Sequence, residues 1–312
     1  MADQIALLFS GQGSQSVGMG RELCAEFPAA AAVYAEADAA LGRPLSKLMA
    51  EGPLDELTRT GNCQPALFVH GLATLAALRE ASGHFNIHAA AGLSLGEFTA
   101  HTAAGTFDFA TGLKLVEARG QFMEDACAAS AGSMAAIIGA EESVVRGLAA
   151  DADVDIANLN CPGQIVISGE DERIMMAVSM AKQIGIRKAI PLQVAGAYHS
   201  RLMDPAYIKL GETLMHVVLQ TPKFPVVANV TGEPAGDFDE TRRTLTEQVT
   251  STVNWTRSIE YMIDSLGCTL FLELGPDDKL AGMVNRIRKG TEVLTVSDPA
   301  SLAKAVLRLK RA

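Results

Sequence analysis

Residues 89–97 read Ala-Ala-Ala-Gly-Leu-Ser-Leu-Gly-Glu, and they place a serine between a predicted strand and a predicted helix. The central part, Gly92–Gly96, fits the pattern G-x-S-x-G. In such a turn a strained backbone exposes the serine hydroxyl, and the two glycines let strand and helix approach without a side-chain clash. N–H groups at the start of the helix favour a developing oxyanion. The stretch predicts an α/β fold with Ser94 as nucleophile; a small-residue turn with an ordinary serine is the alternative.

The chain before and after this turn alternates apolar strands with helices. Residues 5–9 (IALLF) are a continuous apolar run, typical of a buried strand, and the glycine-rich turn SGQGSQSVGMG follows directly. Apolar side chains then recur at helical spacing in residues 28–41 and 64–81. Beyond the serine, Asp108 has the position of an N-cap for a helix that ends near Cys127.

From about Ser130 the pattern changes to short elements in the order β-α-β-β-α-β. The strands are SMAAIIG, DIANLN, QIVISG and RKAIPLQV, and the helices are EESVVRGLAAD and DERIMMAVSMAKQIG. Cys161-Pro162-Gly163 joins the two central strands and is a hairpin signal. This order is that of the ferredoxin-like unit.

Strands and helices alternate again after this unit, so we predict a small ferredoxin-like subdomain inserted into a large α/β-hydrolase-like domain. The returning part contains FPVVANV as a strand, a helix around Trp255, the strand TLFLEL, and helices from there to the end. The predicted limits are residues 1–128 and 198–312 for the large domain and residues 129–197 for the small one.

Composition indicates an ordered protein with anionic character. The 312 residues are 48% apolar and 20% charged, which permits a large core and argues against disorder. A formal net charge of −10 argues against nucleic acid or an anionic membrane as the main partner.

Cysteine usage and hydropathy predict a cytoplasmic protein. The five cysteines are scattered without a C-x-x-C pair, which is typical of reduced thiols. The N-terminus has no basic segment, and the longest apolar stretch, residues 65–78, is interrupted by His70 and is too short for a bilayer span. Neither export nor membrane insertion is expected.

A serine nucleophile needs a base, and one of the six histidines has a distinctive position. His199 lies in VAGAYHSRLMD, where the chain returns from the small domain to the large one. Clefts form at such junctions, so His199 is the candidate base. The others lie in apolar helical stretches, in the middle of a predicted helix, or in a loop without clustered carboxylates where no metal site is expected: His70, His101, His216, His84 and His88.

Arg119 lies on a helical face that is otherwise apolar. In FATGLKLVEARGQFM it is four residues after Leu115, three after Val116, three before Phe122 and four before Met123. It therefore points with these side chains, and a guanidinium on such a face needs a partner for its charge. Two partners fit: an internal carboxylate in a structural salt bridge, or a substrate carboxylate held by two parallel hydrogen bonds.

A set of short motifs occurs in one order along nearly the whole chain. They are GQGSQ at 11–15, QPALF at 64–68, GLSLGE at 92–97, Arg119, NxNxPGQxVISG at 158–169, GAYHS at 196–200 and ELGP at 273–276. Each motif is weak alone, but the ordered set closely resembles the family of malonyl-CoA:acyl carrier protein transacylases of type II fatty-acid synthesis.

The resemblance implies the roles of the reacting groups. Ser94 would be acylated and His199 would be its base. The family has no triad aspartate; a backbone carbonyl orients the histidine, and its position matches Gln248. The oxyanion hole carries over to the backbone N–H groups of Gln12 and Leu95.

The resemblance also implies how the two substrates are recognised. Arg119 matches the arginine that holds the free carboxylate of the malonyl group. Arg286, in NRIRKG, matches a basic position at which the family meets its acidic carrier protein. Arg288 and Lys289 extend it to a basic patch, for which a solvated helix end is an equally good interpretation.

Two positions depart from the family pattern. Leu93 stands where the family usually has histidine before the serine, so a polar contact to the acyl group is missing while the base is unaffected. Tyr198 stands where malonyl-selective members often carry phenylalanine, which keeps an aromatic wall.

We therefore expect a ping-pong transfer of malonyl from malonyl-CoA to the phosphopantetheine thiol of acyl carrier protein by a cytoplasmic monomer without a metal or redox cofactor. A serine esterase or thioesterase, a polyketide-pathway acyltransferase and a non-catalytic docking subunit are the alternatives. An HGGG-type oxyanion loop and an acid in the Ser…Asp/Glu…His order are missing, which disfavours the hydrolase. The intact set of Ser94, His199 and Arg119 disfavours the docking subunit.

Overall fold

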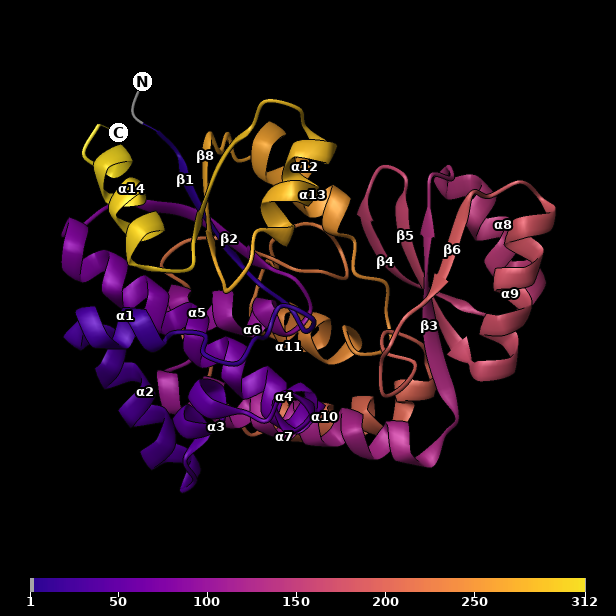
Figure 1. The fold of residues 1–312 in the computed structure, drawn as a ribbon, viewed down its shortest axis with the longest axis horizontal. Helices are drawn as coiled ribbons and strands as arrows, with labels where there is room; N and C mark the ends of the chain where they lie inside the picture. The colour runs from indigo at the N-terminus through magenta and orange to yellow at the C-terminus, as the bar shows by residue number, and fades with distance from the viewer. Residues whose placement is uncertain (1–2, 312) are drawn as a thin grey trace. The chain divides into compact units, whose positions relative to one another are not determined.

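The computed structural model describes residues 3–311 and contains one parallel and one antiparallel sheet (Figure 1). The chain divides into two units. Unit 1 comprises Met1–Gly120, Val217–Val227 and Glu260–Ala312, and unit 2 comprises Gln121–His216 and Ala228–Ile259. The predicted α/β fold class with a ferredoxin-like part is confirmed by the two sheets.

Unit 1 is built on a five-stranded parallel sheet with the order β7-β2-β1-β8-β9. Every residue of β1 and of β8 is buried. Parallel strands that are covered on both faces read as continuous apolar runs, which is why IALLF contains no polar residue. The strands are β1 (Ile5–Phe9), β2 (Ile87–Gly92), β7 (Val226–Val227), β8 (Leu270–Leu274) and β9 (Glu292–Val296).

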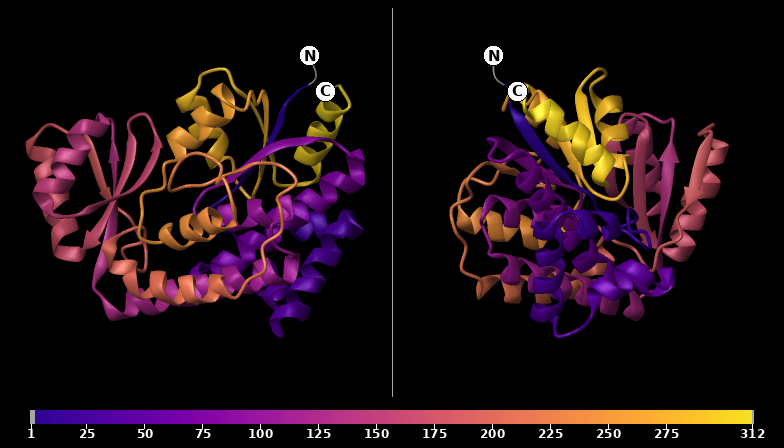
Figure 2. Two further views of the ribbon diagram at one scale, coloured as in Figure 1. Left: turned by 180° about the vertical axis from the view of Figure 1, so that it is seen from behind. Right: turned by 60° about the vertical axis from the view of Figure 1, so that its left-hand side comes forward.

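Helices cover this sheet and join its ends. α6 contacts β1, β2 and β7, α5 contacts β8, and both α13 and α14 contact β9. The start of β1 lies beside α14 (Figures 1 and 2), where Arg308 Nη1 is 2.7 Å from Asp3 Oδ2. The helices of unit 1 are α1 (Arg21–Glu26), α2 (Pro28–Leu41), α3 (Leu45–Glu51), α4 (Leu54–Thr58), α5 (Thr60–Ser82), α6 (Leu95–Ala104), α13 (Lys279–Ile287) and α14 (Pro299–Leu309).

Unit 2 contains the ferredoxin-like sheet, in the antiparallel order β4-β5-β3-β6. Two helices pack on it and bury an apolar core that includes Ile137, Val145, Ile167 and Ile174. The elements are β3 (Gly132–Ile138), α8 (Glu142–Ala152), β4 (Asp155–Cys161), β5 (Gln164–Glu170), α9 (Asp171–Gln183) and β6 (Lys188–Pro191). We keep residues 129–197 as the proposed limits of this subdomain.

The rest of unit 2 consists of short helices and loops. They are η1 (Arg201–Met203), α10 (Asp204–Met215) and α11 (Phe238–Glu247). Two further helices, α7 (Phe109–Ala129) and α12 (Trp255–Asp264), contain the chain positions at which the units divide. The predicted N-cap of α7 is confirmed, because Thr111 N donates to Asp108 Oδ1 at 2.7 Å. Across residues 3–311, every helix falls short of what a bilayer crossing requires.

Several predicted elements differ from the structure. The prediction of helices alone after TLFLEL was wrong, because β9 adds an edge strand there; a short apolar run does not distinguish strand from helix. β6 ends at Pro191, earlier than predicted, and a backbone hydrogen bond to β3, from Leu192 N to Met134 O at 2.9 Å, follows it. His216 is the C-cap of α10 and does not lie in the middle of a helix. α11 was missed, although Asp237 caps it by accepting from Glu240 N at 2.8 Å.

A buried carboxylate fixes the turn between β8 and α13. Glu273 is 0% exposed, and it accepts hydrogen bonds from Leu280 N at 2.9 Å, Ala281 N at 2.8 Å and Thr295 Oγ1 at 3.2 Å. Burial raises the pKa of Glu273 from 4.5 to about 7, although the hydrogen bonds from Leu280 and Ala281 act in the opposite direction. The unfolded chain therefore releases this proton at a lower pH than the folded chain.

This difference predicts a loss of stability as pH rises from about 4.5 to about 7. Glutamine at position 273 is neutral at every pH, so Glu273→Gln serves as the reference. Between these pH values the free energy of unfolding of the wild type should fall by about 3 kcal/mol relative to that of the variant. Denaturant titrations of both proteins between pH 4.5 and 8 measure the difference. The exposed Glu36→Gln is the matched control, and a pH-independent difference for Glu273→Gln would contradict the assignment.

Candidate active site

Ser94 lies in a strained turn between β2 and α6. Its φ of 53° is in the left-handed region, which is unfavourable for a residue with a side chain. A Cβ on Gly92 would lie 1.9 Å from the carbonyl carbon of Gly96, and a Cβ on Gly96 would lie 2.3 Å from Phe9 O. Glycine is required at both positions because backbone touches backbone. The turn has the geometry of a nucleophile elbow.

Arg119 contacts the hydroxyl of this turn from α7. Its Nη2 donates to Ser94 Oγ at 3.0 Å and its Nη1 donates to Gln64 Oε1 at 2.6 Å. The guanidinium carbon lies 5.5 Å from the ring centroid of Phe98, and Arg119 is 1% exposed. These acceptors are neutral, so they position the guanidinium without cancelling its charge. The arrangement directs a buried cation at the Ser94 hydroxyl.

Gln64 is a residue whose role was not predicted from the sequence. It lies in α5, is 1% exposed, and supplies the acceptor for Arg119 Nη1. The QPALF motif contained a sign of this role. Gln64 lies in an apolar helical stretch, where a buried amide needs a hydrogen-bond partner in the same way as Arg119 does. The two signals belong to one interaction.

The glycine-rich loop after β1 passes directly beside the elbow. A Cβ on Gly11 would lie 2.6 Å from Leu93 O. Gln12 Nε2 donates to Thr60 Oγ1 at 3.4 Å, so the side chain of Gln12 is tied to the start of α5. Leu95 is the first residue of α6, where backbone N–H groups have no acceptor within the helix. Gln12 lies in the glycine-rich loop and Leu95 lies at the start of α6, and these two segments meet at the Ser94 turn. Their backbone N–H groups are the predicted oxyanion donors.

His199 lies in unit 2 and is oriented by a backbone carbonyl. Its Nδ1 is 2.8 Å from Gln248 O, and His199 is 4% exposed. A carbonyl oxygen only accepts hydrogen bonds, so Nδ1 carries the hydrogen and Nε2 of the neutral ring keeps a lone pair. The backbone φ of His199 is 56°, a second strained position for a residue with a side chain. This tautomer has the form that a general base requires.

A polar network holds the Gln248 carbonyl in place. Gln248 is the C-cap of α11; its N–H donates to Thr244 O at 3.0 Å and its Nε2 donates to Asn229 Oδ1 at 3.4 Å. Asn229 and Gln248 are both 0% exposed. Asn254 holds the segment that follows Asn229, because its Nδ2 donates to Val230 O at 2.7 Å. The histidine is therefore oriented by a buried scaffold, in which Asn229 is a further residue not predicted from the sequence.

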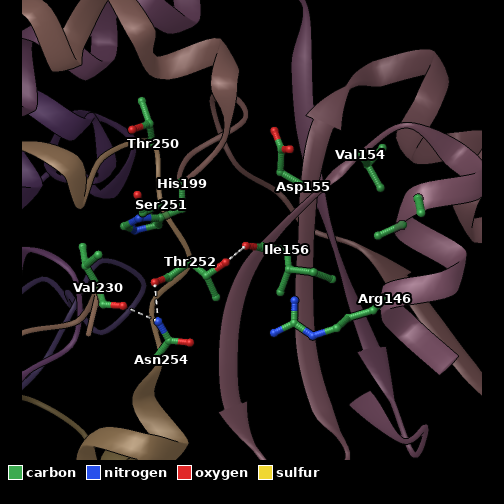
Figure 3. A pocket seen from close by; sticks show the side chains of 12 residues that line it. Arg146, Val154, Asp155, Ile156, His199, Val230, Thr250, Ser251, Thr252 and Asn254 are labelled. Atoms are coloured by element: carbon green, nitrogen blue, oxygen red, sulfur yellow. Dashed lines mark hydrogen bonds between the residues drawn. The ribbon is translucent and has the colours of Figure 1, made fainter. Parts of the chain in front are cut away.

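His199 also lines a pocket of about 560 Å³ within unit 2 (Figure 3). Arg146 of α8 and Asp155 of β4 contribute to one side of it, and residues 250–252 contribute to the other. Thr252 Oγ1 joins the sides by donating to Ile156 O at 2.6 Å. The lining is polar and is framed by the first helix and the edge strand of the ferredoxin-like sheet.

Two other histidines, His70 and His101, are buried and lie within hydrogen-bonding distance of hydroxyl groups. Burial lowers the pKa of His70 and of His101 to about 4. His70 Nδ1 lies 3.2 Å from the Tyr34 hydroxyl, and His101 Nδ1 lies 3.0 Å from Thr106 Oγ1. Within residues 3–311, no group of three or more His, Cys, Asp or Glu side chains is arranged to hold a metal ion.

The predicted basic patch lies at the end of α13. Arg286 is in the last turn of the helix and Arg288 is its C-cap. Arg288 pairs with Asp264 through two hydrogen bonds, of 3.0 Å and 2.8 Å, and these raise the pKa of Arg288. Lys289 is exposed. Asp264 therefore offsets the charge of Arg288 within the patch.

Comparison with known proteins relates the chain to a family. The family described as acyl transferase domain matches residues 6–292. A malonyl CoA-acyl carrier protein transacylase from Bacillus subtilis (strain 168) is 40% identical over 312 residues and covers 98% of each chain. The crystal structure of acyl-carrier-protein-S-malonyltransferase from Bartonella henselae has a TM-score of 0.94 at 38% identity and covers 98% of this chain and 99% of that one. A malonyl-transacylase in complex with its type II PKS acyl-carrier protein has a TM-score of 0.94 at 35% identity, with 98% and 99% covered.

The contact between Gln64 and Arg119 predicts a measurable cost of removing the amide. Gln64→Met keeps the size of the side chain but removes the acceptor of Nη1. Loss of a partner for a buried charged donor should lower the free energy of unfolding by about 1–3 kcal/mol. Urea unfolding measures this, with the exposed Gln183→Met as the control. A stability equal to that of the wild type would show that this hydrogen bond does not hold Arg119.

Proposed function

The chain belongs to the acyl transferase family, and we propose that it transfers a malonyl group from malonyl-CoA to the phosphopantetheine thiol of an acyl carrier protein. The observation that carries the proposal is the hydrogen bond of 3.0 Å from Arg119 Nη2 to Ser94 Oγ. This hydrogen bond places a buried cation beside the proposed nucleophile. A cation there binds most strongly an acyl group that has a free carboxylate.

The first half-reaction acylates Ser94. His199 Nε2 takes the hydroxyl proton as Ser94 Oγ attacks the thioester carbonyl of malonyl-CoA. The tetrahedral oxyanion accepts hydrogen bonds from the backbone N–H groups of Gln12 and Leu95. Collapse breaks the carbon–sulfur bond, and the coenzyme A sulfur leaves with the proton from His199. Arg119 binds the free carboxylate of the malonyl group throughout.

The second half-reaction reverses these steps with a different thiol. The phosphopantetheine thiol gives its proton to His199 and attacks the malonyl-serine ester. When the intermediate collapses, Ser94 Oγ takes the proton back and the malonyl thioester remains on the carrier. The groups named here supply the nucleophile, the base and the oxyanion donors, so the proposed reaction requires neither a metal nor a redox cofactor.

The carrier protein is proposed to dock on the basic patch of Arg286, Arg288 and Lys289. A relative of 35% identity is a malonyl-transacylase in complex with its acyl-carrier protein, which supports a carrier as partner. The carrier serves fatty-acid or polyketide synthesis, and we propose fatty-acid synthesis as the pathway.

We also propose the cellular location and the oligomeric state in which the reaction takes place. All five cysteines are free thiols, which supports a reducing, cytoplasmic location. A monomer is proposed as the working unit.

Intact mass tests the covalent step. After mixing with malonyl-CoA, the wild type should gain the mass of one malonyl group and lose it when carrier protein is added. Ser94→Ala should gain nothing and transfer nothing, because the nucleophile is missing, whereas the exposed Ser265→Ala should behave as the wild type. Rapid release of free malonate without an adduct would favour a hydrolase instead.

Arg119→Ala tests the recognition of the carboxylate. Removing one partner of a buried, bidentate pair should lower kcat/KM for malonyl-CoA by roughly two to three powers of ten. Acetyl-CoA lacks the carboxylate, so kcat/KM for acetyl-CoA should fall only little or should rise. Lysine should restore only part of the activity, since it lacks the planar fork.

The control for this measurement is Arg173→Ala, which replaces an exposed arginine of α9. It should leave kcat/KM unchanged for both substrates. A purely structural role for Arg119 predicts equal losses for both thioesters together with a lower Tm. That outcome would rule out Arg119 as the carboxylate-binding residue.

A further inference from the structure

We propose that Asp277, in the turn after β8, and Lys279, the first residue of α13, are positioning residues. They hold the Gly11–Gln15 loop in the conformation in which Gln12 N–H stabilises the oxyanion. The inference rests on the proposed function, because the role of Gln12 is part of it.

The two residues contact consecutive positions of the loop. Ser14 Oγ donates to Asp277 Oδ1 at 3.0 Å, and Lys279 Nζ donates to Gly13 O. Lys279 Nζ also lies 2.6 Å from Asp277 Oδ2, so the cation and the anion fix each other as well as the loop. Ser14 is 8% exposed, which makes this a contact of the loop's buried side.

These contacts act where the loop has the most conformational freedom. Gly13 has a φ of 100°, a conformation that glycine alone adopts readily. Its N–H donates to Gln15 Oε1 at 2.7 Å, and its carbonyl oxygen accepts from Lys279. Both peptide groups of Gly13 are thereby fixed. Since the peptide before Gly13 contains the Gln12 carbonyl, the backbone of Gln12 is constrained by the same contacts.

The segment that contains Asp277 and Lys279, from the end of β8 to the start of α13, is itself anchored. The Glu273 carboxylate accepts from the N–H groups of Leu280 and Ala281 and so fixes the first turn of α13. A Cβ on Gly275 would lie 1.9 Å from Ser10 Oγ, so the turn also packs directly against the start of the loop. The turn is a fixed support for the loop.

The expected effect is on rate more than on stability. The side chains of Lys279 and Asp277 are 54% and 23% exposed, and exposed ion pairs contribute little to folding. Removing an oxyanion donor outright lowers rates by about a hundredfold to a thousandfold. A donor that is present but less well held should lower the acylation rate less, by about tenfold.

The experiment measures the half-reaction with malonyl-CoA in Lys279→Met, Asp277→Asn and Lys279→Arg. For Lys279→Met we expect a roughly tenfold lower acylation rate at saturation, with the dissociation constant of malonyl-CoA and the Tm nearly unchanged. Asp277→Asn should show a smaller loss, because asparagine can still accept from Ser14. Lys279→Arg should recover most of the rate, since it keeps a cationic donor. Lys304→Met, an exposed lysine of α14, is the matched control.

Infrared spectroscopy of the malonyl-serine, labelled with ¹³C at the ester carbonyl, reports directly on the oxyanion donors. Weaker hydrogen bonding should move this carbonyl band of Lys279→Met to higher wavenumber and broaden it, an effect that a structural role elsewhere would not produce. An unchanged rate and band in Lys279→Met would overturn the proposal. So would losses shared by rate, affinity and Tm with an unchanged band. A wild type that forms no malonyl adduct would overturn the proposed function as well.

Discussion

The site in unit 1 depends on one close contact, the approach of the elbow backbone to the end of β1. Leu93 N donates to Phe9 O at 3.0 Å, and Gly96 lies so near Phe9 O that a Cβ would come within 2.3 Å of it. These contacts hold Ser94 at a φ of 53°, a conformation that costs of order 1–3 kcal/mol and persists only where the surroundings enforce it. The glycine-rich loop follows β1 directly, so the strand whose end contacts the Ser94 turn also leads into the segment that contains Gln12. A strand buried on both faces is suited to this task, because its position is determined by packing on every side.

Buried polar groups then complete each unit in a different way. In unit 1 the guanidinium of Arg119 is positioned by an amide oxygen, a hydroxyl and the ring of Phe98, none of which neutralises it. In unit 2 the ring of His199 is positioned by a carbonyl, and Asn229 and Asn254 hold the segment that carries this carbonyl. A neutral orienting group suits both cases. The amide and hydroxyl oxygens position Arg119 without adding a negative charge of their own, and the carbonyl of Gln248 fixes the tautomer of His199.

Sequence reasoning succeeded where a pattern had one physical explanation. The elbow glycines, the Asp108 cap and the β-α-β-β-α-β order each require particular residues at particular spacings, and the structure has these elements. The inward direction of Arg119 followed from helical spacing, and its burial agrees with this. The partner of Arg119 could not be predicted, because Gln64 is 55 residues away and only the packing of α5 against its neighbours brings the two together. β9 and α11 were missed because an edge strand and a polar helix leave weak hydrophobic patterns.

Leu93 illustrates which part of a motif is chemical and which is structural. The resemblance implied a histidine at this position, yet the contacts of Leu93 with the elbow are made by its backbone. Its N–H donates to Phe9 O, its carbonyl accepts from Gly96 N at 3.0 Å, and the same carbonyl limits residue 11 to glycine. None of these contacts depends on the side chain, so the elbow can form with leucine at this position. Under the proposed function, recognition of the malonyl carboxylate then rests on Arg119, whose contact with Ser94 does not involve residue 93.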